Sequence, residues 1–273
     1  MALKVTINGK IYEAERDEYI LDVCRRNRIL IPTLCNHESI KGLGCCRLCV
    51  VEVNEGGGNK VVVSCVYPLG RDCEVFTESE TIKGIRKTIL SMLKTRAPEG
   101  ERLSSLCQMY GVDTGHGRFT AAKTGEGSSA EKRLASSCVL CGLCAQACAS
   151  LGSGAISTVG RGVGKKISTP YDEPSADCVG CGSCAAVCPT KAIECIETEE
   201  SRSIWGKEFT LLKCASCGRA FATREEYALA LKKAAGENTD APDAIPELES
   251  VLCDACRRKK SADIFAAAFG ERS

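Results

Sequence analysis

The chain has 273 residues, and its 36 Lys and Arg side chains almost balance its 35 Asp and Glu side chains. A formal net charge of +1 favours neither nucleic acid nor an anionic membrane surface as a partner. The 21 cysteines would form disulfides only in an oxidising compartment, whereas the sequence contains neither an export signal nor eighteen consecutive apolar residues. We therefore expect a cytoplasmic chain outside the bilayer whose clustered cysteines bind metal.

Residues 1–78 are expected to form one small α+β domain. Residues 3–8 alternate apolar and polar side chains and end in the turn signal Asn8-Gly9, which predicts a β-hairpin. Asp17 is expected to cap a helix that continues to about Asn27. Further strands are predicted at Leu48–Val53, Lys60–Val63 and Val75–Phe76.

Residues 79–130 are predicted to form a connector helix and a linker. Apolar residues between Ile82 and Leu93 recur at the spacing of an amphipathic helix. Residues 111–130 are rich in Gly, Thr and Ser, so we expect an exposed loop in which His116 is a solvated side chain.

Two further modules are predicted after this linker. Residues 131–200 contain the central cysteines, and the 29 residues between their two runs are expected to form a loop or hairpin over the clusters. Residues 201–273 are expected to be a separate C-terminal metal-binding module with a helix at Arg224–Ala235.

The first cysteine group is typical of a 2Fe-2S cluster. Its four cysteines, which begin at Cys35 and end at Cys65, are separated by gaps of ten, two and fifteen residues. One loop can therefore bring three thiolates together, while a distant strand end supplies the fourth. Gly42 and Gly44 suit such a tight loop. Cys45 is the alternative to Cys46 as ligand, but choosing it would make the spacing to Cys49 Cys-x3-Cys. We therefore expect the ligands Cys35, Cys46, Cys49 and Cys65.

The central group repeats the pattern Cys-x2-Cys-x2-Cys-x3-Cys and predicts two 4Fe-4S clusters. In this motif the fourth cysteine of each run ligates the other cluster. One cluster is therefore assigned to Cys138, Cys141, Cys144 and Cys188. The other is assigned to Cys178, Cys181, Cys184 and Cys148. Two zinc sites from the same residues are the disfavoured alternative, because zinc does not require three cysteines at repeated two-residue gaps.

The last group consists of two Cys-x2-Cys pairs, at Cys214, Cys217, Cys253 and Cys256. Such paired turns are typical of a zinc ribbon, in which one tetrahedral ion joins them. The 35-residue gap between the pairs is longer than usual for this class. A further iron-sulfur cluster or a single iron is therefore the alternative to zinc.

Three N-terminal segments, Thr33–His37, Gly44–Val50 and Val63–Cys65, resemble the two-iron ferredoxin domain that opens the large iron-sulfur subunit of respiratory complex I. Similar domains open the small diaphorase subunits of NAD-linked hydrogenases and many iron-only hydrogenases. The resemblance implies a β-grasp fold for residues 1–78.

The resemblance covers about residues 1–95 and 131–195, including Val159–Gly162 and both central cysteine runs. Members of the family usually hold a further four-iron cluster between these domains, with one His and three Cys ligands. This chain offers only Cys107 and, later, His116, so we expect that cluster to be absent.

These features together predict an electron-transfer subunit of a multi-subunit cytoplasmic oxidoreductase, of the hydrogenase, formate dehydrogenase or NAD(P)H-oxidising type. The sequence has no nucleotide-binding glycine fingerprint and no paired nucleophile and base, so we expect catalysis in another chain. The expected partners are a flavin-containing NAD(P)H-oxidising subunit and a catalytic subunit, to which the C-terminal module would dock the chain. No nucleic acid and no membrane insertion are expected.

The alternative is a free-standing redox-sensing or regulatory protein that uses its C-terminal module to bind a partner or nucleic acid. The basic run Arg257–Lys260 is the feature that invites this alternative. A solvated surface accounts better for the run, because the net charge is near zero and no aromatic pattern accompanies it.

Overall fold

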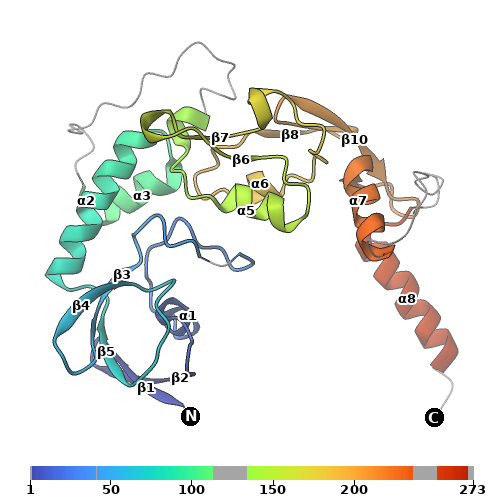
Figure 1. Cartoon of the computed structure of the whole chain (residues 1–273). Helices are drawn as coiled ribbons and strands as arrows, with labels where there is room; N and C mark the ends of the chain where they lie inside the picture. Colours follow the sequence, from blue (N-terminus) through green and yellow to red (C-terminus); the bar gives the residue numbers. More distant parts are fainter. Residues whose placement is uncertain (1, 41, 113–133, 236–250, 270–273) are drawn as a thin grey trace. The chain divides into compact units, whose positions relative to one another are not determined.

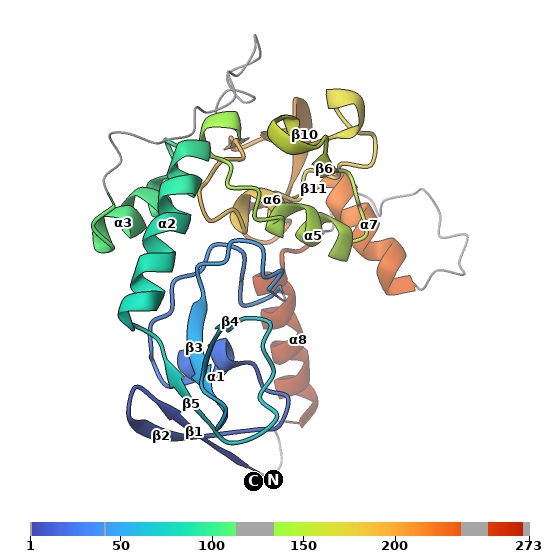
Figure 2. The same cartoon turned by 60° about the vertical axis from the view of Figure 1, so that its left-hand side comes forward.

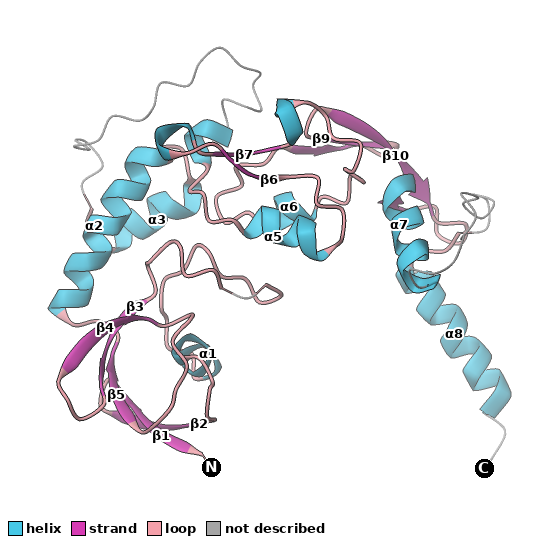
Figure 3. Cartoon of the chain, in the orientation of Figure 1, coloured by secondary structure: helices cyan, strands magenta, loops and turns pink. Residues whose placement is uncertain are grey.

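The computed structural model describes residues 2–40, 42–112, 134–235 and 251–269 (Figure 1). The chain divides into two compact units. The first comprises Met1–Ser150, Ser157–Ser168 and Ser183–Glu194; the second comprises Leu151–Ile156, Thr169–Gly182 and Cys195–Ser273. Both contain helices and strands, as Figure 3 shows, which agrees with the predicted α+β class. Among the described residues no helix combines the length and the apolar character needed to cross a membrane.

The strands of the first unit are β1 (Leu3–Ile7), β2 (Lys10–Ala14), β3 (Val50–Asn54), β4 (Asn59–Val63), β5 (Cys73–Phe76), β6 (Ser157–Val159) and β7 (Lys166–Ser168). Its helices are α1 (Ile20–Arg26), α2 (Glu80–Arg96), α3 (Glu101–Met109), α5 (Leu143–Ser150) and α6 (Ser183–Ala186). The second unit contains β8 (Cys195–Glu197), β9 (Ser201–Ile204), β10 (Lys207–Lys213), β11 (Ala220–Thr223), α7 (Arg224–Ala235) and α8 (Asp254–Phe269). Short 3-10 turns lie at Gly162–Gly164 and Pro170–Asp172.

The N-terminal part of the first unit is a five-stranded mixed sheet in the order β2-β1-β5-β3-β4. Strands β1 and β5 are parallel, and the other neighbours are antiparallel. Helix α1 covers this sheet (Figure 2) with a buried face that contains Ile20, Leu21 and Val23. The alternating side chains of β1 and β3 complete the core beneath it. This order of strands with one covering helix agrees with the expected β-grasp fold.

The predicted cap of α1 is wrong. The helix begins at Ile20, and its N-cap is Tyr19, which makes no side-chain cap. Asp17 instead has a left-handed backbone with φ of 66°, and its N–H donates to the carbonyl of Leu69. A contact with a residue more than fifty positions away therefore replaced the local cap.

The connector helix is longer than the sequence predicted. Helix α2 begins after Ser79, whose hydroxyl accepts a hydrogen bond from the N–H of Ile82 at 3.2 Å. Its buried positions are Ile82, Arg86 and Leu90, at i, i+4 and i+8. Helix α3, which the sequence did not predict, packs against it, and Leu103 and Cys107 of α3 are buried.

The second unit is built on an antiparallel sheet in the order β11-β10-β9-β8. Its apolar side chains Ile204, Phe209, Leu211 and Leu212 are buried. Helix α7 occupies the predicted bounds Arg224–Ala235 and contacts β10 and β11. The domain boundaries at residues 78, 130 and 200 stay predictions, and most of the predicted 111–130 loop, with His116, lies outside the described residues.

Candidate metal centres

The four predicted ligands of the two-iron site are all buried. The relative exposures are 1% for Cys35, 6% for Cys46, 0% for Cys49 and 4% for Cys65. The N–H of Cys46 donates to the sulfur of Cys35 at 3.3 Å, and the N–H of Ser64 donates to the carbonyl of Cys49 at 3.0 Å. The structure thus brings a loop and the end of β4 together, as the spacing predicted.

The thiols at this site differ in pKa. The neighbouring thiols of Cys45, Cys46 and Cys65 lower the pKa of Cys35. The pKa of Cys49 is lowered to about 7, chiefly by the neighbouring thiol of Cys65, whereas the interaction with Cys35 and burial raise the pKa of Cys46 and Cys65. Neighbouring thiolates repel one another, so these buried thiols cannot all be anionic without compensating positive charge. A 2Fe-2S cluster supplies that charge, so the donor set fits it.

Cys45 is the fifth sulfur at this site. It lies close enough to Cys35 to lower the pKa of that thiol, but its side chain is exposed and its thiol donates to the carbonyl of Cys141 at 3.1 Å. Cys46 is buried. Burial therefore favours Cys46 as the ligand, in agreement with the two-residue gap to Cys49.

The loop glycines are required by close approach. A Cβ built on Gly42 would lie 2.6 Å from Nδ2 of Asn36 and 3.3 Å from the sulfur of Cys65. Gly44 has a φ of +63°, a conformation that side chains with a Cβ rarely adopt. Both observations agree with the sequence prediction that this loop needs glycine.

A buried arginine that the sequence interpretation missed holds this loop from α2. The side chain of Arg86 is fully buried. Its Nε donates to the carbonyl of Leu48 at 3.0 Å and its Nη2 to the carbonyl of Val50 at 2.8 Å, the two residues on either side of Cys49.

The remaining nitrogen of Arg86 is also hydrogen-bonded. Its Nη1 donates to the hydroxyl of Tyr110 at 2.8 Å and pairs with the carboxylate of Glu78. The signal for this residue was present in the sequence, because a cation interrupts the apolar stripe of α2 at i+4 from Ile82. A charge on a buried face requires partners.

The first predicted four-iron site lies wholly within the first unit. Its four cysteines line one small cavity, whose other lining residues are mostly apolar and include Val139 and Ile167. The cysteines that line the cavity are Cys138, Cys141, Cys144 and Cys188. Backbone N–H groups already point at two of the sulfurs: Leu140 donates to Cys138 at 3.4 Å, and Ala192 donates to Cys188 at 3.2 Å.

Three of these thiols have raised pKa values. Burial raises the pKa of Cys141 to about 12 and also raises the pKa of Cys138 and Cys144. An apolar cavity therefore holds thiols that need nearby positive charge before they ionise. The cavity, its donors and its crossed ligand set fit a 4Fe-4S cluster.

The second predicted four-iron set draws residues from both units. Cys148 lies on α5 and Cys184 on α6 in the first unit, whereas Cys178 and Cys181 belong to a loop of the second unit. Its assignment therefore stays a prediction from the crossed motif.

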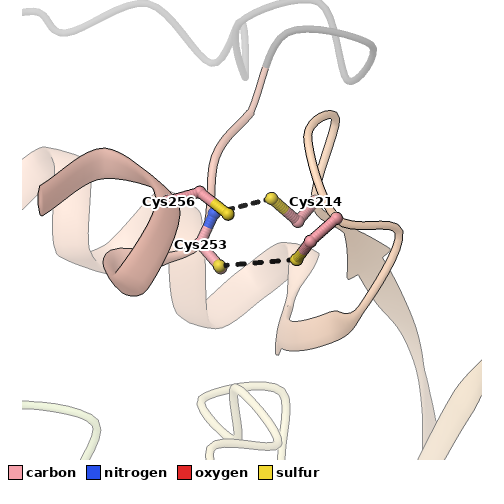
Figure 4. A group of neighbouring side chains, drawn as sticks. Cys214, Cys253 and Cys256 are labelled. Carbon is pink, nitrogen blue, oxygen red and sulfur yellow. Dashed lines mark hydrogen bonds between the residues drawn. The ribbon is translucent and has the colours of Figure 1, made fainter. Parts of the chain in front are cut away.

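The last group converges in the second unit. The four sulfurs of Cys214, Cys217, Cys253 and Cys256 lie within 4.8 Å of one another. Cys214 comes from the turn after β10, whereas Cys253 precedes α8 and Cys256 lies in its first turn, and Figure 4 shows their side chains directed toward one another. The N–H of Cys253 donates to the sulfur of Cys214 at 3.3 Å. This and other backbone donors lower the pKa of Cys214 to about 6.

The spacing of these sulfurs fits a single ion. A tetrahedral zinc with Zn–S bonds of about 2.3 Å places its sulfurs about 3.8 Å apart. The sulfurs of Cys217 and Cys253 are 3.9 Å apart. A four-iron cluster puts four metal ions between its thiolates and therefore needs wider spacing. The donor geometry thus favours one zinc or one iron over a cluster.

Two family models match the chain at these sites. Residues 1–80 match a 2Fe-2S iron-sulfur cluster binding domain, and residues 137–192 match a 4Fe-4S dicluster domain. The predicted combination of two ferredoxin domains is therefore confirmed. Neither model extends to the last cysteine group.

The chain is also similar to known proteins. The chain is 31% identical over 181 residues to the NADH-ubiquinone oxidoreductase 75 kDa subunit of Reclinomonas americana, a match that covers 61% of this chain and 26% of the relative. It is 31% identical over 116 residues to the NAD-reducing hydrogenase HoxS subunit gamma of Cupriavidus necator, covering 41% of this chain and 47% of the relative. The predicted resemblance is confirmed.

A solved structure is similar to part of this chain. A chain in the crystal structure of an NAD+-reducing NiFe hydrogenase in the H2-reduced state matches with a TM-score of 0.52 and 26% identity, covering 61% of this chain and 74% of that one. This chain spans less than half the length of each of the two curated relatives named above. The activities of those whole proteins can therefore only be proposed for this chain.

Proposed function

We propose that this chain is an electron-transfer subunit of a multi-subunit oxidoreductase. In this proposal it relays electrons between a flavin-containing NAD(P)H-oxidising subunit and a catalytic subunit of the same complex. One 2Fe-2S cluster and two 4Fe-4S clusters, held by the twelve predicted cysteines, supply one-electron storage when bound. The chain itself supplies their ligands, their insulation from water and the contacts between them.

The observation that carries the proposal is the direct contact between the two ligand segments of the first unit. The thiol of Cys45, next to the ligand Cys46, donates to the carbonyl of Cys141, itself a predicted four-iron ligand. A Cβ built on Gly142 would lie only 2.9 Å from Cδ1 of Leu43, so these loops also pack against each other.

A common hydrophobic core surrounds this contact. It contains the two-iron ligands Cys35 and Cys46, the four-iron ligand Cys141, and the buried Cys107 of α3. Two redox sites whose ligand segments touch inside one core can exchange electrons without an intervening site. The chain therefore does not require the His-ligated cluster that the related proteins usually carry between these domains.

We further propose that the last cysteine group binds one zinc ion that stabilises the C-terminal segment and helps to dock the chain in its complex. The support is the sulfur spacing of a single tetrahedral ion. Zinc has no redox chemistry. This site would then lie outside the electron path.

Metal analysis and spectroscopy test the function directly. Protein purified anaerobically should contain about ten iron atoms and about ten acid-labile sulfides per chain, together with about one zinc ion. Reduction should produce separate electron paramagnetic resonance (EPR) signals for the two-iron and four-iron clusters. Protein that binds only zinc, with negligible iron and sulfide, would contradict the proposal.

The alternative of a free-standing regulatory protein has no support from the relatives named above, which are oxidoreductase subunits. Anaerobic affinity purification from native extract distinguishes the electron-transfer subunit from the regulatory protein. Recovery of stoichiometric flavin-containing and metal-containing subunits is expected. A monomer that binds nucleic acid in a salt-dependent manner would instead favour the regulatory protein.

A further inference from the structure

The segment after the second cysteine run holds one of the predicted ligand loops. Neither family model extends beyond residue 192. The four-stranded sheet β8–β11 nevertheless contacts the loop Cys178–Cys181 within the second unit. The sequence predicts residues 201–273 as a separate module, whereas the contacts described below join its sheet to a predicted cluster loop.

Side chains from three strands donate hydrogen bonds to three successive backbone carbonyls of this loop, one bond from each strand. Lys207 of β10 donates its Nζ to the carbonyl of Cys178 at 3.1 Å. Thr223 of β11 donates its hydroxyl to the carbonyl of Val179, and Arg202 of β9 donates its Nη1 to the carbonyl of Gly180 at 2.9 Å. One such bond would be an ordinary surface contact. Three bonds to consecutive carbonyls show that the side chains of the sheet are placed to bind the backbone of the loop.

Packing reinforces these bonds. Gly180 has a φ of +68°, and a Cβ built on it would lie 2.6 Å from the ring of Phe209. Phe209 is 1% exposed, and the Nζ of Lys207 lies 4.8 Å from its ring centroid. The loop therefore lies directly on the aromatic face of β10.

The donors are themselves held in place. Thr223 is fully buried, and its hydroxyl accepts the N–H of Glu226 at 3.0 Å in the first turn of α7. Arg202 is 13% exposed and pairs with Glu197 at 2.7 Å and with Glu226 at 3.6 Å. A side chain already fixed by other partners loses little entropy when it binds the loop.

We propose that this sheet positions the Cys178–Cys181 loop of the second four-iron site, and that the positive charges of Arg202 and Lys207 raise the reduction potential there. This inference rests on the proposed function, because it requires the loop to hold a cluster. Reduction adds negative charge at the thiolates, and neighbouring cations and oriented dipoles stabilise that charge. Glu197 and Glu226 partly offset Arg202.

The test uses the full-length chain, purified anaerobically, in EPR-monitored redox titrations. Arg202→Gln and Lys207→Gln keep a hydrogen-bond donor but remove the charge. Each should lower the reduced-to-oxidised ratio of one four-iron cluster about tenfold at a fixed potential, which corresponds to 59 mV for a one-electron couple. Glu197→Gln should raise the reduced-to-oxidised ratio of the same cluster at that potential. Lys213→Gln is the matched control, because Lys213 is an exposed lysine of β10, the strand that carries Lys207. It should not shift the reduction potential of this cluster.

A hydrogen-bond variant separates positioning from charge. Thr223→Val removes one donor to the loop without changing charge, so iron should be lost to a chelator faster while the potential of the retained cluster changes little. Shifts of the same sign for Arg202→Gln and Glu197→Gln, or no shift for either, would overturn the inference. Wild-type protein without four-iron signals would instead reject the proposed function, which the iron content reports independently.

Discussion

Replacing Arg86 by Met should destabilise the two-iron domain by about 3–6 kcal/mol. Arg86 is fully buried, and methionine can fill much of its volume but donates no hydrogen bond. The substitution removes two hydrogen bonds from a charged group to the backbone carbonyls of Leu48 and Val50, each worth about 1.5–3 kcal/mol. Glu78 adds little to the loss, because its side chain is 45% exposed and water can solvate it.

Urea unfolding of the full-length protein under anaerobic conditions measures this effect. The visible circular dichroism of the two-iron cluster reports the domain that contains Arg86. With a slope of about 1–3 kcal/mol per molar urea, the midpoint of Arg86→Met should fall by at least about 1 M. Lys87→Met is the matched control, because Lys87 is the next residue of α2 and is exposed. Equal midpoints for the two variants would refute the role assigned to Arg86.

Three further predictions concern the ligands and their loops. Cys46→Ser should abolish or strongly alter the two-iron EPR signal whereas Cys45→Ser should keep it, and the reverse result would assign Cys45 as the ligand. Gly42→Ala should reduce two-iron occupancy severalfold on iron analysis, because its Cβ would collide with Asn36; full occupancy would show that the loop can relax. Cys217→Ser should lower the zinc content from about one ion per chain to near zero while the iron-sulfur spectra persist, and loss of those spectra would place the last cysteine group in the electron path.

Much of the metal chemistry was predictable from spacing, because ligand gaps such as Cys138-x2-Cys141 are local properties of the chain. Periodicity also predicted the strands of the N-terminal sheet and the bounds of α7. It failed at Asp17, where a hydrogen bond to Leu69 replaced the expected helix cap. It also missed α3 and the whole of the sheet β8–β11, which are short elements stabilised by packing against their neighbours.

The sequence alone predicted which cysteines would bind metal and which kinds of clusters they would suit, and the family models confirm the two kinds of iron-sulfur domain. Only the tertiary structure decided what holds the ligand loops and which of them touch. Arg86 reaches a carbonyl 38 positions away, Thr223 one 44 positions away, and Cys45 one 96 positions away. No pattern in the sequence encodes such pairs directly, because each forms only when separate elements pack and bring a side-chain donor to a backbone carbonyl.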